Sequence, residues 1–415
     1  MSNLQPVRGT HDLYFEDVRR YRHILKVAQT LCENYGFSEI KTPIFEFSNV
    51  FSRTLGDASD IVSKEMYTFT DKGGDSLSLR PEGTASVVRA FLSEGLAQNL
   101  PLKFYYEGPM FRYERPQKGR YRQFYQLGVE LLGVDNPDAD IEVISLAQHL
   151  LHQLKMADKC VLEINSIGDK ESRDVYRNEL VSYYKKHLSS LSQDSQKRLE
   201  INPLRILDSK DKGDIEVNKS APLLTDFFNK SSQETFEKVQ ERLKQLNISF
   251  TLNPHLVRGL DYYSHTVFEF RTTALGSQDA VLSGGRYDGL CELMGGPKTP
   301  AVGWAAGVER LSLLLSDVPT SQRPFALIPL GAEAEDLCRK LAHELRGKGL
   351  CVDLAYGGNM SNRMKKATKN KAFAAILIGD QEIQSKEYTL KILDTGAQEK
   401  VRAEKLYSRL QEFSL

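Results

Sequence analysis

The sequence lacks the features of a membrane or secreted protein. No apolar run in its 415 residues approaches the roughly 18 residues that a membrane-spanning helix needs. The N-terminal stretch, MSNLQPVRGTHDLYFEDVRR, has no apolar core of the kind found in signal peptides. These absences predict a protein without a membrane partner.

Cysteine is scarce and scattered. The five cysteines, at positions 32, 160, 291, 338 and 351, include no C-x-x-C pair and no spacing typical of metal ligands. An odd number of dispersed thiols is typical of reduced cysteines in the cytoplasm. We therefore expect a cytoplasmic protein with neither structural disulfides nor a protein-built metal site.

The sequence also lacks an excess of charge of either sign. Lys and Arg together number 55, as do Asp and Glu, so nucleic-acid binding would have to depend on local basic patches. Hydrophobic residues make up 40% and charged residues 27%, which excludes disordered, collagen-like and coiled-coil chains. A globular chain of this length predicts two or three domains.

Apolar periodicity predicts a largely antiparallel sheet with helices packed on it. Residues 14–35 have a helical spacing, and the segment from Gly36 to Glu46 begins like a strand that Pro43 confines to an edge or end. Helices are too few for a strict βαβ alternation, so we expect an α+β fold. Further strand-like runs are Ser76–Leu79, Leu102–Glu107, Gln123–Leu132, Val267–Arg271 and Ala301–Ala305.

Composition shifts divide the chain. Residues 168–250 are rich in Lys, Ser, Asp and Asn with helical patterns, which predicts an inserted helical domain between residues 1–167 and 251–320. A polar, Pro-bearing linker at 317–324 precedes a compact alternation of strands and helices. Residues 323–415 are therefore predicted to form a separate α/β domain.

The densest cluster of charge lies between two predicted strands. Residues 112–122 contain five basic residues and one acid, Glu114, while Pro116 and Gly119 favour a loop. Such a loop suits a polyphosphate or a nucleic-acid end, but a solvated charged turn accounts for the same residues equally well.

The strand that follows favours the ligand interpretation. One face of 124–130 carries Phe124, Gln126, Gly128 and Glu130, and the other face is apolar. A polar face with a gap at Gly128, beside an arginine-rich loop, is typical of a ligand-binding floor.

Three other segments have weaker site-like character, and each alone is more typical of a structural turn. Arg80–Thr84 places Glu82 in a turn, where Thr84 is expected to cap the next helix. The segment 257–263 joins an arginine to two tyrosines, and 283–288 is predicted to be a Gly-Gly turn with an arginine and an aspartate.

A small-residue strand at 303–307 leads into a helix with Leu311, Leu314 and Leu315 buried. Gly303, Ala305 and Gly307 would lie on one face and leave room for a flat ligand. Arg310 gains nothing from the helix dipole in the first helical turn, so an anionic ligand would account for it.

Taken together, these segments resemble class II aminoacyl-tRNA synthetases, and within that class the histidyl-tRNA synthetase family. The Pro43 segment, the arginine loop and the strand ending at Glu309-Arg310 resemble motifs 1, 2 and 3 of the class. Residues 256–263 and 284–288 resemble the two signatures of the family, and residues 6–12 resemble its usual opening. Trp304 stands where the family commonly has Phe, and Ser209 where it often has Cys.

The resemblance implies an activity in two steps. L-Histidine and ATP form histidyl-adenylate, and histidine then passes to the terminal ribose of tRNA(His). Because a carboxylate must approach a phosphate, the first step needs preplaced positive charge and no general base. The implied catalytic residues are Arg112 and Arg258, on opposite sides of the α-phosphate; ATP binding is implied for Arg112, Glu114, Phe124 and Arg310.

The resemblance also implies where histidine binds. Glu82, Thr84 and Gln126 match the residues that hold the α-amino group, and Glu130 and Tyr263 match the imidazole pocket. A carboxylate and a phenol satisfy the donor and the acceptor of an imidazole. The full implied set is Glu82, Gly83, Thr84, Arg112, Gln126, Glu130, Arg258, Tyr262, Tyr263 and Tyr287.

Contacts to tRNA are implied at two places. Arg115, Gln117 and Lys118 match the loop that contacts the acceptor end. In the C-terminal domain, which binds the anticodon in this family, Arg363, Lys365 and Lys366 belong to a run, 361–371, with five basic residues and no acid. A solvated helix face is the alternative for that run, although residues 323–415 carry 16 basic against 12 acidic residues.

The resemblance further implies a homodimer through motif 1 and Mg²⁺ accompanying ATP. His149 and His152, three apart on a predicted helix, are interpreted as structural because no third metal ligand is apparent. The alternative function is a non-catalytic, histidine-sensing regulatory paralogue that serves ATP phosphoribosyltransferase. Such a paralogue is expected to lose the ATP-gripping arginines, which this chain retains.

Overall fold

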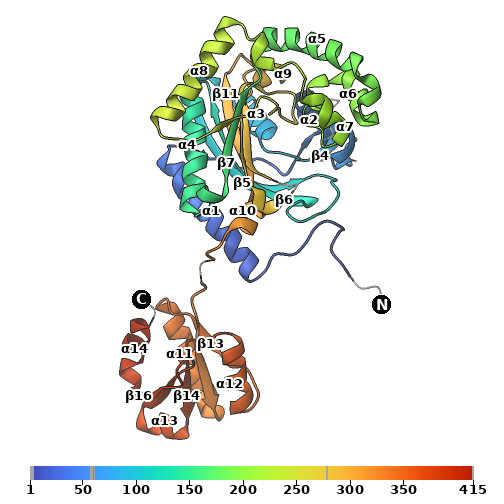
Figure 1. Ribbon diagram of the computed structural model, residues 1–415. Coiled ribbons are helices and arrows are strands. Elements are labelled where there is room, and N and C mark those ends of the chain that lie inside the picture. Colours follow the sequence, from blue (N-terminus) through green and yellow to red (C-terminus); the bar gives the residue numbers. More distant parts are fainter. Residues whose placement is uncertain (1–3, 57–58, 60, 277–278, 319, 414–415) are drawn as a thin grey trace. The chain divides into compact units, whose positions relative to one another are not determined.

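A computed structural model describes residues 4–56, 59, 61–276, 279–318 and 320–413. Two units are separable, Met1–Pro319 and Thr320–Leu415, and the boundary falls within the predicted linker. Figure 1 shows a strand-rich body in the first unit and a smaller sheet with helices in the second. Within the described residues, no helix is both long and apolar enough to cross a membrane.

The first unit is built on an eight-stranded sheet. Its neighbouring strands run antiparallel except for the outermost pairs, β1·β5 and β7·β8, which are parallel. The prediction of an α+β fold with a largely antiparallel sheet is confirmed. In spatial order the strands are β1 (Ser38–Glu39), β5 (Leu102–Phe111), β6 (Gln123–Leu132), β11 (Ala301–Gly307), β10 (Ala280–Arg286), β9 (Ser264–Arg271), β7 (Val161–Ser166) and β8 (Thr251–Leu252).

One face of this sheet forms the main core. Leu127 and Val129 of β6 point into it, as their alternation predicts, and both are 1% exposed or less. Leu311 and Leu314 pack into it from α10. The helices that contribute to this core are α1 (Glu16–Asn34), α4 (Asp138–Gln153), α8 (Lys230–Gln245) and α10 (Val308–Leu314), and Figure 1 shows α1, α4 and α8 on the same side.

Short elements pack around the other face and leave room for a site. A three-stranded sheet runs β2 (Phe45–Phe47), β4 (Ser76–Leu79), β3 (Thr68–Thr70). Three helices pack together beside it, namely α2 (Ser48–Leu55), α3 (Thr84–Ser93) and α9 (Leu290–Leu293).

The segment 168–250 is helical, with α5 (Lys170–Lys186), α6 (Gln193–Ile201), α7 (Lys212–Asn218) and α8. Tyr176, Leu180 and Tyr184 of α5 share a hydrophobic core with Tyr262 and Tyr263. Helix α5 is therefore packed against the loop that leads into β9, whereas α8 contributes to the main core. The treatment of this segment as an inserted domain, with boundaries at 168 and 250, stays a prediction.

The predicted turn at residues 283–288 is wrong. Gly284 and Gly285 lie within strand β10. They are glycines because the neighbouring strand leaves no room for a side chain: a Cβ on Gly284 would lie 2.2 Å from the carbonyl oxygen of Gly303. Arg286 ends the strand at 2% exposed and forms buried ion pairs with Asp140 and Asp288, at 2.8 and 3.1 Å. This arginine ties the sheet to α4.

The second unit has a five-stranded sheet in the order β13, β12, β14, β15, β16. The edge strand β16 and helix α13 were not predicted, because β16 (QEKVR) is mostly polar and α13 is only six residues long. The strands are β12 (Phe325–Leu330), β13 (Val352–Leu354), β14 (Ala374–Gly379), β15 (Glu387–Ile392) and β16 (Gln398–Arg402); the helices are α11 (Ala332–Gly347), α12 (Met360–Lys369), α13 (Asp380–Ser385) and α14 (Leu406–Glu412).

Candidate active site

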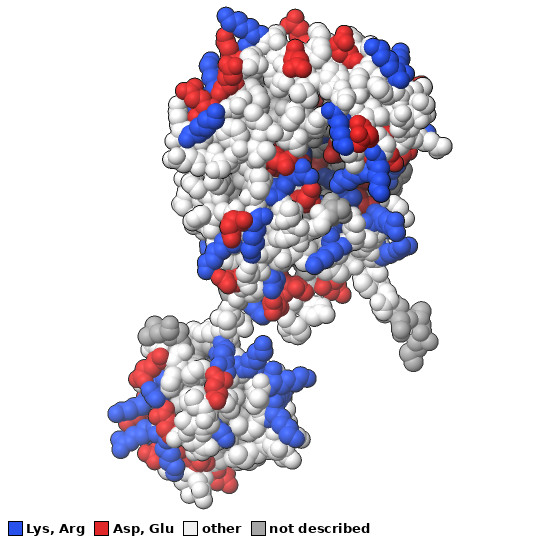
Figure 2. All heavy atoms as spheres, in the orientation of Figure 1, with Lys and Arg blue, Asp and Glu red and all other residues white. Residues whose placement is uncertain are grey.

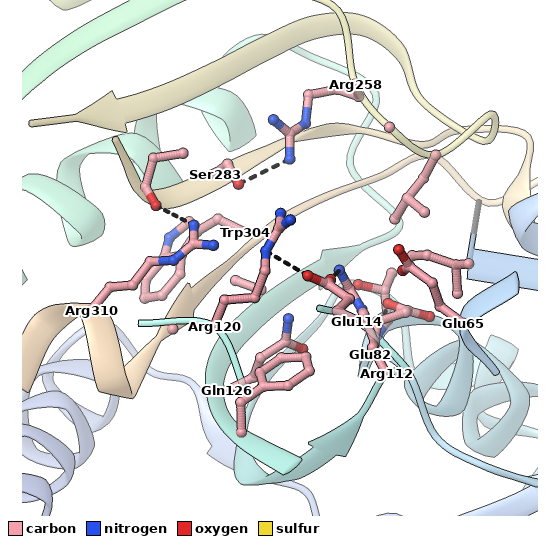
Figure 3. Close-up of a pocket in the computed structure, with 18 of the residues that line it drawn as sticks. Glu65, Glu82, Arg112, Glu114, Arg120, Gln126, Arg258, Ser283, Trp304 and Arg310 are labelled. Atoms are coloured by element: carbon pink, nitrogen blue, oxygen red, sulfur yellow. Dashed lines mark hydrogen bonds and ion pairs between the residues drawn. The ribbon is translucent and has the colours of Figure 1, made fainter. Parts of the chain in front are cut away.

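A cavity of about 390 Å³ opens on the face of the large sheet opposite the main core. Strands β6, β10 and β11 supply its floor, and the loops 112–122 and 256–263 supply its walls. Figure 3 shows the labelled arginines reaching it from different segments of the chain, and Figure 2 shows basic side chains gathered around a hollow of the first unit. Its charged lining is Arg112, Arg120, Arg205, Arg258 and Arg310 with Glu65, Glu82, Glu114 and Glu309.

The arginine loop and α10 bring positive charges together at one end of this cavity. The side chain of Arg310 donates to the carbonyl oxygen of Ala280 at 2.6 Å. Burial lowers the pKa of Arg310, and the like charges of Arg120 and Arg112 lower it further. Glu114, which pairs with Arg120 at 2.5 Å, offsets part of this charge. Mutually repelling guanidinium groups are stabilised by a polyanion, so this end suits a polyphosphate.

A fourth arginine approaches from the loop 256–263. Arg258 pairs with Glu269 of β9, and its Nη2 donates to Ser283 Oγ at 2.9 Å (Figure 3). Burial alone lowers the pKa of Arg258, but the Glu269 carboxylate outweighs this and raises it. Arg258 is therefore a fixed cation, aimed by partners on two strands of the sheet.

The floor beside Arg112 is flat and partly aromatic. The guanidinium of Arg112 lies 5.4 Å from the ring centroid of Phe124, and its Nε donates to the carbonyl oxygen of Pro81 at 2.9 Å. Ala305 and Gly307 of β11 line the same cavity. An aromatic ring facing small residues is suited to a stacked heterocycle.

A buried polar cluster lies behind the floor at the other end. Glu130 is only 1% exposed; it accepts a hydrogen bond from the Tyr287 hydroxyl at 2.5 Å and another from the Thr84 hydroxyl at 2.7 Å. Burial raises the pKa of Glu130 to about 8. The rings of Tyr262 and Tyr263 lie beside it in tilted contact, with their centroids 4.7 Å apart, and both line the cavity.

The predicted helix cap at Thr84 is wrong. The carboxylate of Glu82 instead accepts from the backbone amides of Thr84 and Ala85, at 2.7 Å each, at the start of α3. A carboxylate satisfies these amides and the helix dipole better than a hydroxyl does. The Thr84 hydroxyl is thereby released to bond Glu130.

The gap at Gly128, predicted to be part of a ligand-binding floor, is filled by a side chain of the protein itself. Tyr106 of the adjacent strand β5 occupies it, since a Cβ on Gly128 would lie 2.3 Å from the phenol ring. A Cβ on Gly83 would meet the same ring at 2.2 Å. The gap thus admits a buried tyrosine, which closes the floor beneath Thr84 and Glu130.

The cavity thus combines a cationic end, an aromatic floor and a buried carboxyl group. A family model described as "Histidyl-tRNA synthetase" matches residues 9–311. The chain belongs to the histidyl-tRNA synthetase family. A second model, "Anticodon binding domain", matches residues 325–413, so the second unit carries the anticodon-binding domain of that family.

Histidyl-tRNA synthetase relatives cover the chain almost completely. It is 56% identical to a histidine–tRNA ligase of Rhodospirillum rubrum and 50% identical to that of Gluconobacter oxydans, in each case over 97% of both chains. The crystal structure of apo Staphylococcus aureus histidyl-tRNA synthetase matches with a TM-score of 0.82 and 35% identity, over 98% of this chain and 99% of that one. Enzymes of this family are aminoacyl-tRNA synthetases that use ATP as a substrate.

Most of the residues that the sequence singled out come together, although their individual roles stay predictions. Two do not line the cavity: Gly83 packs on Tyr106, and Glu130 lies just behind Thr84, Tyr287 and Gly303. Those that line it are Glu82, Thr84, Arg112, Glu114, Phe124, Gln126, Arg258, Tyr262, Tyr263, Tyr287 and Arg310.

The proposed tRNA contacts lie elsewhere. Arg115, Gln117 and Lys118 are exposed on the arginine loop, as a contact with a large partner requires. On α12, Lys365 and Lys366 are exposed, and Figure 2 shows basic side chains along that part of the second unit.

The predicted contact of Arg363 with tRNA does not agree with its position in the structure. It is 7% exposed, pairs with Glu335 at 2.6 Å and donates to the carbonyl oxygen of Pro329. A guanidinium held in this way packs α12 onto its own unit. The basic composition of residues 361–371 does not show which side chain is buried. That depends on the helix period, which turns one residue in three or four toward the core.

Sequence reasoning missed several residues of the site, among them Glu65, which lines the cavity. Arg120 and Arg205 line the cavity, Glu269 orients Arg258, and Tyr106 fills the floor. Arg120 was counted in the basic loop without being singled out, and the alternation of β9 places Glu269 beside the pocket. The contributions of Arg205 and Tyr106 depend on tertiary packing. Among the described residues, no group of three His, Cys, Asp or Glu is arranged to hold a metal ion, and His149 bonds Tyr35 at 2.7 Å.

Burial of Glu130 predicts a pH-dependent stability. Its pKa rises from an ordinary value of 4.5 to about 8, so the folded protein retains a proton that the unfolded chain loses across this window. The free energy of unfolding should therefore fall as the pH rises from about 5 to 8. Glu130→Gln removes this loss, and the variant's Tm should gain a few degrees on wild type across that range. Thermal unfolding of both proteins at several pH values measures this; a constant difference in Tm would contradict it.

Proposed function

We propose that this chain is a histidine–tRNA ligase that forms histidyl-adenylate from L-histidine and ATP and then transfers histidine to the 3′-terminal adenosine of tRNA(His). The observation that carries the proposal is the convergence of Arg112, Arg258 and Arg310 on one cavity, next to the buried cluster of Glu130, Thr84 and Tyr287. Sequence identity of 56% to a histidine–tRNA ligase over almost the whole chain supports the same activity.

The arginines account for the first step. The carboxylate of histidine attacks the α-phosphate of ATP, a new P–O bond forms, and pyrophosphate leaves. Because the nucleophile is already ionised, the protein must supply charge rather than a base. Arg112 and Arg258 are proposed to hold the α-phosphate. Arg310, with its pKa lowered by burial and by neighbouring like charges, is proposed to hold the far end of the triphosphate. Phe124 is proposed to stack on adenine, with Glu114 beside it.

The buried cluster accounts for selectivity. The α-amino group is proposed to bind near Glu82, Thr84 and Gln126, and the imidazole near Glu130 and Tyr263. The imidazole N–H adds a donor to Glu130 that an apolar side chain of similar size lacks, so such side chains are proposed to bind less tightly. This pocket supports histidine as the amino acid.

The remaining partners are proposed from the surface. Exposed Arg115, Gln117 and Lys118 suit the acceptor end of tRNA(His), and Lys365 and Lys366 suit its anticodon region. Mg²⁺ is expected to accompany ATP, because phosphate oxygens and water fill most of its six positions; the Glu65 and Glu114 carboxylates on the cavity wall are hard donors of the type it accepts.

A homodimer is proposed through the segment around Pro43. Ile44, Phe45 and Phe47 are 45–55% exposed on and beside edge strand β2, and Phe69 of the same small sheet is 45% exposed. An exposed group of large apolar side chains is typical of a protein interface.

The proposal is tested by histidine-dependent exchange of pyrophosphate into ATP without tRNA, followed by charging of tRNA(His). Exchange that requires histidine is the expected result. A folded protein that binds histidine but supports no exchange would instead indicate the regulatory paralogue, an alternative weakened by the retained arginines and anticodon-binding domain.

A further inference from the structure

The loop at residues 257–263 carries three proposed site residues, Arg258, Tyr262 and Tyr263, but has little regular structure of its own. Outside helices and strands, the backbone–backbone hydrogen bonds of the described residues include none from or to residues 257–263. A loop without such bonds has many accessible conformations, and a site built on it must be held by other groups.

Besides Glu269 and Ser283, which orient Arg258, side chains from three further segments hold this loop. At its start, Asn165 of β7 donates to the carbonyl oxygen of Leu256 at 3.0 Å. In its middle, Asn202 Nδ2 donates to Asp261 Oδ1 at 2.7 Å. At its end, Arg173 Nη1 donates to the carbonyl oxygen of Tyr263 at 2.6 Å.

Two of these three side chains belong to the helical segment 168–250. Arg173 lies in the first turn of α5, and Asn202 precedes the short 3-10 helix Pro203–Ile206. Arg205, from the same 3-10 helix, lines the main cavity and attracts Asp261. A smaller cavity of about 120 Å³ lies between this segment and the loop, so packing alone leaves the contact incomplete.

We infer that Arg173 and Asn202 are positioning residues for histidine activation: by fixing the two ends of Asp261–Tyr263, they hold Arg258 and Tyr263 in the geometry that the proposed reaction needs. Both hydrogen bonds involve an ionised group, the Arg173 guanidinium in one and the Asp261 carboxylate in the other. The bond from Arg173 is the stronger of the two, because it is partly buried whereas the bond from Asn202 is exposed to water. The helical segment therefore contributes to adenylate formation before any tRNA is bound. This inference rests on the proposed function.

The test is pyrophosphate exchange without tRNA on Arg173→Ala, Arg173→Lys and Asn202→Ala. Arg173→Ala should raise the KM for histidine about tenfold, the factor that loss of one charged hydrogen bond gives, and leave the KM for ATP within about twofold. Arg173→Lys, which retains one donor, should recover most of the activity. Asn202→Ala should raise the KM for histidine by a smaller factor. The double variant Arg173→Ala/Asn202→Ala should show a larger increase than either single variant.

Lys185→Ala, at an exposed position in the last turn of α5, is the matched control and should behave as wild type. Histidine and ATP KM values that rise together in Arg173→Ala, or a lysine variant as impaired as the alanine variant, would mean that Arg173 only stabilises the fold. Unchanged exchange in Arg173→Ala and Asn202→Ala would overturn the inference while the wild-type exchange still upheld the proposed function. Absence of exchange in wild type would instead overturn the proposed function.

Discussion

Arg258→Ala should reduce histidine-dependent pyrophosphate exchange by about 10²–10³-fold in kcat/KM, the usual effect of removing one preorganised donor from a developing negative charge. The reason lies in its surroundings: Glu269 and Ser283 fix the guanidinium before any substrate arrives, so no reorganisation is needed during the reaction. Arg258→Lys should recover only part of the activity, because a single ammonium lacks the planar, bidentate contact with phosphate.

A loss of activity in Arg258→Ala must be distinguished from a loss of folding. Arg258→Ala leaves Glu269 largely buried without its main partner, since both side chains are 15% exposed. The double variant Arg258→Ala/Glu269→Gln removes that unpaired charge and should remain just as inactive. Arg271→Ala is the control: this arginine of β9 is ion-paired as well, with Glu163 and Asp279, but does not line the cavity. Near-wild-type exchange in the double variant would refute the role of Arg258.

The fold was largely predictable wherever one period dominated the sequence. Strands β4 and β6 begin and end where the alternation places them, and α1 lies within the predicted helix. Prediction failed where tertiary contacts override local preference. The pair Gly284-Gly285 predicts a turn, yet both residues lie in a strand. Glycine is required there because β9 and β11 approach too closely for side chains. The polar edge strand β16 has no period strong enough to mark it.

The site was predictable as a set of segments, and less so as a set of contacts. Motif spacing indicated the arginine loop and the strand face of β6, because both are continuous in sequence. Spacing could not show that Glu82 rather than Thr84 caps α3, or that Tyr106 fills the gap at Gly128. It could not show that Arg363 turns inward to Glu335. These outcomes depend on which partner lies across a sheet or helix contact, which one sequence does not specify.

Glu130→Ala should raise the KM for histidine about a hundredfold and leave the KM for ATP within about twofold. The change removes the carboxylate proposed to accept the imidazole N–H, and it leaves the Tyr287 and Thr84 hydroxyls, which donate to it at 2.5 and 2.7 Å, without their acceptor.

Glu130→Gln keeps the shape of the side chain but supplies an amide in place of a carboxylate, so its effect on histidine should be intermediate. Glu142→Gln is the control, because Glu142 of α4 pairs with Lys103 and does not line the cavity. Measured by pyrophosphate exchange at varied histidine and varied ATP, equal increases in both KM values would refute the assignment. That result would place Glu130 in the support of the cavity floor, where Gly303 already leaves room for its carboxylate, since a Cβ there would lie 1.9 Å from Glu130 Oε2. A rise confined to histidine would instead require that this buried carboxylate faces the substrate, and it would explain why β11 carries glycine at that position.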